Sequence, residues 1–212
     1  MENGGTNGFG TYTIPKVDSG LKEYYIEEEN YGGKTKFGSV GGKLIAPVEG
    51  SSGEPRFYIM ALEDINPGTT YCWYSAASNG QMNDYANTTS EDFGTGAKNT
   101  QTMIAKWDAS EYGVQNSDEM YADMWGVEEL RKKVNDGWFV PSRAEWSAFA
   151  DMATKELGLT TDNYENYGLK ESSYWSSSQF SKNGAYRTGF SSGFIVANNV
   201  WQDYPVRLSA NF

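Results

Sequence analysis

Residues 137–146 read GWFVPSRAEW and carry the clearest local signal in the chain. Residues 137–141 predict a short strand that runs into a proline. Ser142 and Glu145 then have the spacing of a capping box, in which each side chain accepts a hydrogen bond from the other residue's backbone N–H. We interpret both residues as helix caps rather than as catalytic groups. The helix that follows is expected to bury the face that carries Trp146, Phe149, Ala150, Ala153 and Leu157.

The sequence upstream of this helix predicts two strands and two further helices. Residues 56–62 (RFYIMAL) predict a buried strand that ends before the turn Asn-Pro-Gly at 66–68, and residues 69–75 (TTYCWYS) predict a second strand. A short helix is expected to open at Asn99, and another is expected to span residues 120–134. Their buried sides are predicted to carry Met103, Ile104 and Trp107 in the first helix, and Val127, Leu130 and Val134 in the second.

The N-terminal quarter of the chain has a different character. Residues 1–20 are rich in Gly, Asn and Thr and are typical of a linker or an extended arm. Residues 21–53 alternate short apolar pieces with glycine and predict a β-rich segment. Its acidic run at residues 27–29 is read as an exposed strand end or loop rather than as a cation site. We therefore expect a boundary near residue 55, between an N-terminal arm with a β-rich attachment or packing segment (1–55) and a main domain (56–212).

The overall composition favours short strands and turns over a helical bundle, and together with the predicted strands and helices this indicates an α+β fold. It also argues against several functions. The 212 residues include 24 glycines but only 6 prolines, and 15% are aromatic, which predicts many turns and short strands around an aromatic core. The net charge of −11 argues against nucleic acid and anionic membranes as partners. Histidine is absent, which removes the commonest general base. The single cysteine, Cys72, is interpreted as a small buried residue rather than a nucleophile.

No run of about 18 apolar residues is present, so a membrane-spanning helix is not expected. The first ten residues, MENGGTNGFG, also lack the charged-then-apolar pattern of a signal peptide. Whether Met1 is the natural start stays open.

The C-terminal tail breaks with the composition of everything before it. All 17 glutamates lie at or before Glu171, and the tail contains only one lysine, Lys182. Residues 1–171 carry a net charge of −13, whereas residues 172–212 carry +2. What remains is mostly Ser, Asn, Gly and aromatic residues, the types that supply contact area and adaptable hydrogen bonds in recognition surfaces.

The segment GWFVPSRAEW, then YWSSSQ at residues 174–179, then the Gly-, Asn- and aromatic-rich tract and finally VRLSANF at 206–212 form an ordered set. This set resembles the C-type-lectin-fold variable proteins that retroelements diversify in bacteria and phages, within the superfamily of formylglycine-generating enzymes. Residues 57–75 and 93–107 are similar to the same group. The resemblance covers roughly residues 57–212. It implies a C-type lectin fold, with short antiparallel strands and two to three flanking helices, whose variable region spans about 174–208.

In that family, adenines in selected codons, mostly AAC or AAT, are replaced during reverse transcription of a template. Such codons never yield Glu, Lys, Gln, Met or Trp, and a tail without glutamate matches this chemistry. The fixed set then includes Trp175, Gln179, Lys182, Trp201 and Gln202. Positions read as buried or as turns are Trp175, Ala185, Phe190, Gly193, Ile195, Val206 and Leu208, while Arg207 is read as a structural ion-pair partner.

The remaining tail positions form the candidate binding surface, which the resemblance presents as one patch. They are Phe180, Asn183, Tyr186, Arg187, Ser191, Ser192, Phe194, Val196, Asn198, Asn199, Asp203 and Tyr204. Each of Phe180, Tyr186 and Phe194 is equally compatible with a place in the core.

The resemblance implies a ligand-binding, adhesin-like or receptor-binding protein without enzymatic activity or a required cofactor. The implied partner is a protein or another surface macromolecule on a target cell, and the implied carrier is a phage tail or a bacterial surface. Two alternatives stay open: a relative of the formylglycine-generating enzymes, and a structural adhesin module whose tail does not vary. Asp162, Asn163 and Glu165 could supply oxygen ligands for a structural calcium ion, although a solvated loop is the preferred interpretation. The oligomeric state and the ligand's identity stay open.

Overall fold

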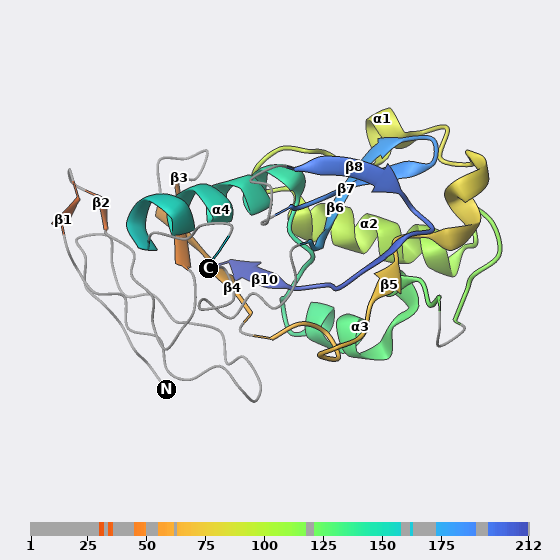
Figure 1. Ribbon diagram of the computed structural model, residues 1–212, viewed down its shortest axis with the longest axis horizontal. Helices are drawn as coiled ribbons and strands as arrows, with labels where there is room; N and C mark the ends of the chain where they lie inside the picture. The colour runs from red at the N-terminus through yellow and green to blue at the C-terminus, as the bar shows by residue number, and fades with distance from the viewer. Residues whose placement is uncertain are drawn as a thin grey trace.

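The protein is a mixed α+β chain with small antiparallel sheets, which confirms the expected α+β class (Figure 1). The computed structural model describes residues 30–31, 34–35, 45–49, 55–61, 63–117, 121–157, 162, 173–189 and 195–211. The arm at residues 1–20 and the acidic run at 27–29 lie outside these residues. Within the parts described, no helix has both the length and the apolar character needed to cross a membrane.

A three-stranded sheet joins segments from both ends of the chain. Its strands are β3 (Ile45–Glu49), β4 (Pro55–Met60) and β10 (Ser209–Asn211), with β4 in the centre and both neighbours antiparallel to it (Figure 1). The strand predicted at residues 56–62 is thus confirmed. Since β3 precedes residue 55, this sheet draws on both sides of the predicted boundary. A separate two-stranded pair, β1 (Asn30–Tyr31) and β2 (Lys34–Thr35), lies earlier in the chain.

The turn at residues 66–68 reverses the chain after β4. The Thr69 N–H donates to the carbonyl of Asn66 at 3.0 Å, and Gly68 adopts φ +88°, which fits a type II turn with proline at its second position. The strand predicted at 69–75 is only two residues long, β5 (Tyr71–Cys72).

Strand β5 ends early because the residues after Cys72 do not continue its regular pattern of backbone hydrogen bonds. Trp73 and Tyr74 both donate their N–H groups to the single carbonyl of Val200, which interrupts the regular ladder. Ser75 then donates its N–H to the Asp123 carboxylate at 2.6 Å and begins the 3₁₀ helix η1 (Ser75–Asn79).

The described residues then form four α-helices, and two of them begin away from their predicted starts. They are α1 (Tyr85–Thr88), α2 (Gly96–Asp108), α3 (Glu128–Asn135) and α4 (Arg143–Leu157). The helix expected to open at Asn99 opens at Gly96 instead. Asn99 is buried inside α2, where its side chain accepts from the Ser90 N–H and donates to the Ser90 carbonyl, at 3.0 and 2.7 Å. Its amide therefore fixes a loop rather than capping a helix.

The helix predicted at residues 120–134 is replaced by a 3₁₀ turn, η2 (Met124–Gly126), followed by α3. Asp123 explains the break because its carboxylate accepts from the Ser75 and Asn116 N–H groups and from the Trp107 indole, which holds the residue in an extended conformation. Leu130 is fully buried as predicted, whereas Val127 and Val134 are partly buried against the same core.

The capping box at the start of α4 is confirmed. Glu145 donates its N–H to Ser142 Oγ at 3.2 Å, and the Ser142 N–H donates to Glu145 Oε2 at 2.6 Å. The strand predicted at residues 137–141 is reduced to an isolated antiparallel bridge between Phe139 and Ser209. Trp146 and Phe149 are buried as expected, while Ala150 is half-buried. The side chains of Ala153 and Leu157 lie outside the described ones.

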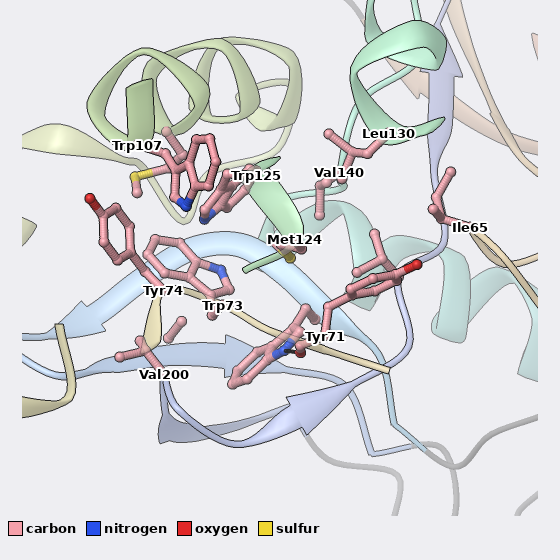
Figure 2. Close-up of a cluster of buried hydrophobic side chains, with 14 of the residues drawn as sticks. Ile65, Tyr71, Trp73, Tyr74, Trp107, Met124, Trp125, Leu130, Val140 and Val200 are labelled. Atoms are coloured by element: carbon pink, nitrogen blue, oxygen red, sulfur yellow. Dashed lines mark hydrogen bonds between the residues drawn. The ribbon is translucent and has the colours of Figure 1, made fainter. Parts of the chain in front are cut away.

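The main core is built on tryptophan side chains from segments that are far apart in the sequence (Figure 2). Trp73 and Trp125 meet edge to face, with ring centroids 5.2 Å apart and planes at 90°. Gly126 packs so closely against the Trp107 indole that a Cβ atom there would overlap the ring. A buried indole removes roughly 200 Å² from water, which corresponds to about 5 kcal/mol by area. The aromatic residues are therefore the main source of stability.

Arg207 pairs with Asp64 in the interior, as the sequence predicts. Its Nε donates to Asp64 Oδ1 at 2.6 Å, and both side chains are at least 97% buried. The guanidinium also lies over the Tyr174 ring, 5.2 Å from its centroid. Removing either partner would leave an uncompensated buried charge, so the pair fixes the tail to the segment after β4.

Candidate binding surface

The candidate residues lie mainly on a second antiparallel sheet. Its strands are β6 (Trp175–Ser181), β7 (Gly184–Arg187) and β8 (Val196–Asn199), in that order, and they run beside α2 (Figure 1). Trp175 pairs with Arg187 and Gln179 pairs with Ala185, so β6 carries two extra residues and bulges between these pairs.

Strand alternation divides the candidates between the two faces of this sheet. Ala185 is fully buried, so its neighbour Tyr186 points to the opposite, outer face. Phe180 lies on this outer face too, because its neighbour Gln179 pairs with Ala185. Arg187 shares the inner face with Asn198, which lies opposite Ala185 on β8. The expected single patch is therefore split into two groups within the sheet.

Phe180 and Tyr186 form the aromatic centre of the outer face. Phe180 is 49% exposed, and its ring meets that of Tyr186 edge to face at 5.2 Å. The Tyr186 hydroxyl donates to Glu91 Oε1 at 2.9 Å, and Arg143 lies 5.0 Å above its ring. Arg143 in turn donates to Glu91 Oε2 at 2.7 Å. Burial, followed by the hydrogen bond to Glu91, raises the pKa of Tyr186.

Three candidates at the other face are engaged with one another. The Arg187 guanidinium lies 4.8 Å from the centroid of the Tyr204 ring, and Asn198 Nδ2 donates to the Tyr204 hydroxyl at 2.7 Å. Tyr204 also packs edge to face against the buried Trp175, with centroids 4.9 Å apart. Arg187 Nη1 donates to Ser173 Oγ at 2.6 Å. This group is half-buried and mutually bound, so it is less available to a partner than Phe180.

The remaining described candidates lie at the turn between β6 and β7, on β8, and on β9 (Asp203–Tyr204), which pairs with β5 in a separate two-stranded sheet. Asn183 and Asp203 are exposed, and Asp203 accepts from Thr70 Oγ1 at 2.6 Å. Val196 is half-buried, and Asn199 accepts from the Trp201 N–H through its side chain. The other three, Ser191, Ser192 and Phe194, lie outside the described residues.

The positions read as scaffold mostly lie where expected. Those that are buried are Trp175, Gln179, Ala185, Val206 and Leu208, and Ile195 is half-buried. By contrast, Lys182 and Trp201 are exposed at turns, and Gln202 is half-buried. Phe190 and Gly193 lie outside the described residues.

The outer face rests on residues 89–95, which we call the support loop. From one side, Ser178 Oγ donates to the Ser90 carbonyl at 2.8 Å, and the Gln179 N–H donates to Thr89 Oγ1 at 2.8 Å. From the other side, Ser142 Oγ donates to the Asp92 carbonyl at 2.8 Å. The loop is thus held between β6 and the start of α4, which gives the outer face a rigid base.

Glu145 connects the capping box to the support loop. Its Oε1 accepts from the Gly94 N–H at 3.1 Å, in addition to the bond from the Ser142 N–H. The side chain is 1% exposed, and burial raises the pKa of Glu145 to about 6 against the opposing effect of these hydrogen bonds. The residue read as a helix cap therefore also orders the loop that carries Glu91.

A pocket of about 460 Å³ opens beside Phe180. The residues that line it come from α1, the support loop, the first turn of α2 and β6. They are Tyr85, Ala86, Asn87, Thr88, Thr89, Ser90, Glu91, Thr95, Lys98, Asn99, Gln179 and Phe180. This volume falls in the range of small-ligand sites. Only Phe180 belongs to the candidate set, so most of the pocket was not predicted.

Glu91 and Arg143 are the residues at the outer face that sequence reasoning missed. Arg143 lies inside the SRAE motif, but capping explains that motif fully and gives no sign of a contact to Tyr186. Glu91 lies in a polar loop, 95 residues away from Tyr186 in the sequence. Glu91 and Arg143 carry opposite charges, but nothing in the sequence indicates that these two residues meet in the fold.

The described residues offer little for metal binding or thiol chemistry. Among them, no group of three or more His, Cys, Asp or Glu side chains is placed to hold a metal ion. Asp162 is exposed, while Asn163 and Glu165 lie outside the described part. Cys72 is buried as predicted, and its thiol donates to the Trp201 carbonyl at 2.9 Å. Burial, and then the charges of Asp123 and Asp203, raise its pKa to about 12.

Comparison with protein-family models, with curated proteins and with solved structures found no match to this chain.

Proposed function

We propose that this chain is a non-enzymatic binding protein of C-type lectin fold whose outer face contacts a protein or another macromolecule on a target cell. The observation that carries the proposal is Phe180. It is a large aromatic side chain, 49% exposed, near the end of β6, an edge strand whose preceding residues are buried. Exposed aromatic residues on rigid supports are the usual anchors of protein interfaces.

The lectin-type fold is supported by the arrangement of the chain's ends. β10 lies antiparallel beside β4, and the helices α1 to α4 and the sheet of β6, β7 and β8 are inserted between them in the chain. This arrangement fits the resemblance that the GWFVPSRAEW and YWSSSQ motifs carry.

We also propose that a retroelement diversifies the tail. The separation of buried from outward-facing tail residues supports this idea. Trp175 and Gln179 are at least 97% buried, and adenine replacement in AAC or AAT codons cannot produce either residue type. Phe180 and Tyr186, which it can produce, lie on the outer face. The DNA beside the gene should then contain a near-identical copy of the 3′ end that differs at adenines. A source genome without such a copy would leave the non-diversified adhesin module as the better reading.

The alternative of a formylglycine-generating activity is less well supported. That chemistry needs reactive cysteines, and Cys72 is buried with its pKa raised to about 12, which keeps the thiol protonated.

A whole-cell binding assay tests the function with a matched pair of variants. The labelled protein is titrated onto a panel of bacterial strains, and Phe180→Ala and Tyr121→Ala are compared on each strain that binds. Tyr121 is also 49% exposed but lies outside the tail. We expect Phe180→Ala to weaken binding at least tenfold and Tyr121→Ala to leave it unchanged. Equal losses, or a loss with Tyr121→Ala alone, would place the interface elsewhere.

A further inference from the structure

We infer that the pocket beside Phe180 takes one aromatic side chain of the partner, with a neighbouring carboxylate of the partner at Lys98. This inference rests on the proposed function and gives the partner a chemical signature. All of its lining residues except Gln179 and Phe180 lie outside the tail, so it also implies a largely fixed subsite next to a changeable face.

The walls of the pocket favour a flat apolar group. Tyr85 and Phe180 both line it, with Tyr85 half-buried against the core and Phe180 half-exposed at the mouth. Aromatic side chains pair well with a third ring in edge-to-face or offset arrangements. A volume of about 460 Å³ leaves room for one indole or phenol ring with part of its backbone.

Several polar groups that line the pocket already have hydrogen-bond partners within the protein. The Gln179 amide donates to the Tyr112 hydroxyl at 3.2 Å, and Thr89 Oγ1 accepts the Gln179 N–H at 2.8 Å. The Asn99 side-chain amide is hydrogen-bonded to the Ser90 backbone, and Ser90 Oγ donates to the Asp92 carboxylate at 2.8 Å. A ligand rich in hydroxyls would find few free partners there and would lose hydrogen bonds to water on entry. The pocket therefore selects against a sugar.

The charge at the rim comes from Lys98. Glu91, the acidic residue that lines the pocket, is held by Arg143 and Tyr186, so it does not neutralise this lysine. Lys98 is exposed on the first turn of α2, and the structure records no ion pair for it among the described residues. The positive end of the helix adds to the preference for an anion. An aromatic residue next to Asp, Glu or a terminal carboxylate matches both the walls and the rim.

Three small probes test the inference without the natural partner. N-acetyl-tryptophanamide, N-acetyl-tryptophan and methyl galactoside are titrated separately, and backbone amide chemical shifts are followed by NMR. We expect both indoles to shift the Thr89 and Gln179 amides saturably at millimolar concentrations, and the glycoside to leave them in place. The carboxylate probe should bind about threefold more tightly than the amide at low salt, since an exposed ion pair is a weak interaction. Lys98→Gln or added salt should remove this difference.

A filling variant and its control make the assignment specific. Ala86 is exposed and lines the pocket, so Ala86→Trp should occupy it and abolish the indole shifts. Val114→Trp adds the same side chain at a residue that is 82% exposed and does not line the pocket, and should leave them intact. Indole shifts that persist in Ala86→Trp, or glycoside shifts in place of indole shifts, would overturn the inference. The whole-cell assay with Phe180→Ala tests the proposed function separately, so the proposed function and the aromatic subsite can each be contradicted without the other.

Discussion

The buried tryptophans and the outer face use the same kinds of side chain in opposite ways. In the core, the indole N–H of Trp73 donates to the Ser176 carbonyl at 2.8 Å, and that of Trp175 donates to the Tyr71 carbonyl at 2.7 Å. Each ring thereby ties β6 to the β5 region while its carbon surface is fully buried. At the outer face, Phe180 touches Tyr186 and leaves half its surface in water. The difference is one of partners rather than of residue type.

This comparison implies that core aromatics determine stability and outer aromatics do not. The largest expected effect is that of Trp73→Ala, which opens a cavity and removes the bond to the Ser176 carbonyl. We expect a loss of about 3–5 kcal/mol in the free energy of unfolding. Urea denaturation followed by circular dichroism measures it. A loss below about 1 kcal/mol would show that the two regions do not differ as proposed.

A smaller effect is expected from filling space in the core. Gly126→Ala places a Cβ atom against the Trp107 indole and should cost about 1–3 kcal/mol, because a well-packed core resists added volume. The double variant Gly126→Ala/Trp107→Phe should cost less than the sum of the two single changes, measured in the same denaturation assay. Additive losses would mean that the ring is not what the new methyl group meets.

Glu145→Gln tests how much the hydrogen bonds beneath the outer face contribute to stability, in comparison with the buried tryptophans. The change keeps one acceptor oxygen but weakens the clamp between Ser142 and Gly94, and we expect a cost of about 1–2 kcal/mol near pH 7. Ser147→Ala, which is half-buried on the same helix, serves as the control. An unchanged free energy of unfolding in Glu145→Gln would mean that this clamp does not stabilise the loop.

The same variant makes a prediction about pH. Burial raises the pKa of Glu145 to about 6 from the ordinary value of 4.5, so the folded state holds an extra proton between these values. The stability contributed by this group therefore decreases as the pH rises from about 4.5 to about 6. Asp84 titrates at lower pH: burial raises its pKa, but the hydrogen bonds from Lys106, Tyr112 and Thr88 together outweigh burial and lower the pKa to about 2. The difference between wild type and Glu145→Gln, measured from pH 4 to 7, isolates the effect. A difference that does not change with pH would contradict it.

The smallest stability effect is expected at Phe180. Phe180→Ala removes a half-exposed ring and should change the free energy of unfolding by about 0.5 kcal/mol or less. Thermal unfolding beside Trp73→Ala measures the contrast directly. A loss comparable with that of the core variant would make Phe180 a core residue and would remove the anchor from the proposed interface.

The sequence predicts the local parts of this fold better than the contacts between them. The capping box of Ser142 and Glu145 was predictable because both partners lie three residues apart. The buried position of Trp175 and the pairing of Arg207 followed from residue type. The strand near residue 73 was overestimated, since its early end depends on Val200 and Asp123, which are distant in sequence.

The candidate surface shows the same limit. Tyr186 and Arg187 are adjacent and look equivalent in the sequence, yet strand alternation sends them to opposite faces. The bulge in β6, which decides that Phe180 faces outward, depends on pairing with β7 and has no local signal. The pocket was not predictable either, because α1, α2 and β6 meet only in the folded chain.

The position of β10 has a consequence for how the protein is made. Ser209 pairs with Met60 and bridges to Phe139, so the three-stranded sheet stays open until residues 209–211 have been synthesised. A frameshift or stop codon anywhere in residues 174–207 would remove this strand together with the Arg207 partner of Asp64. Such a product would keep an open sheet edge and an unpaired buried carboxylate, both of which favour misfolding. Closure of the three-stranded sheet thus makes folding depend on an intact reading frame through residues 174–208.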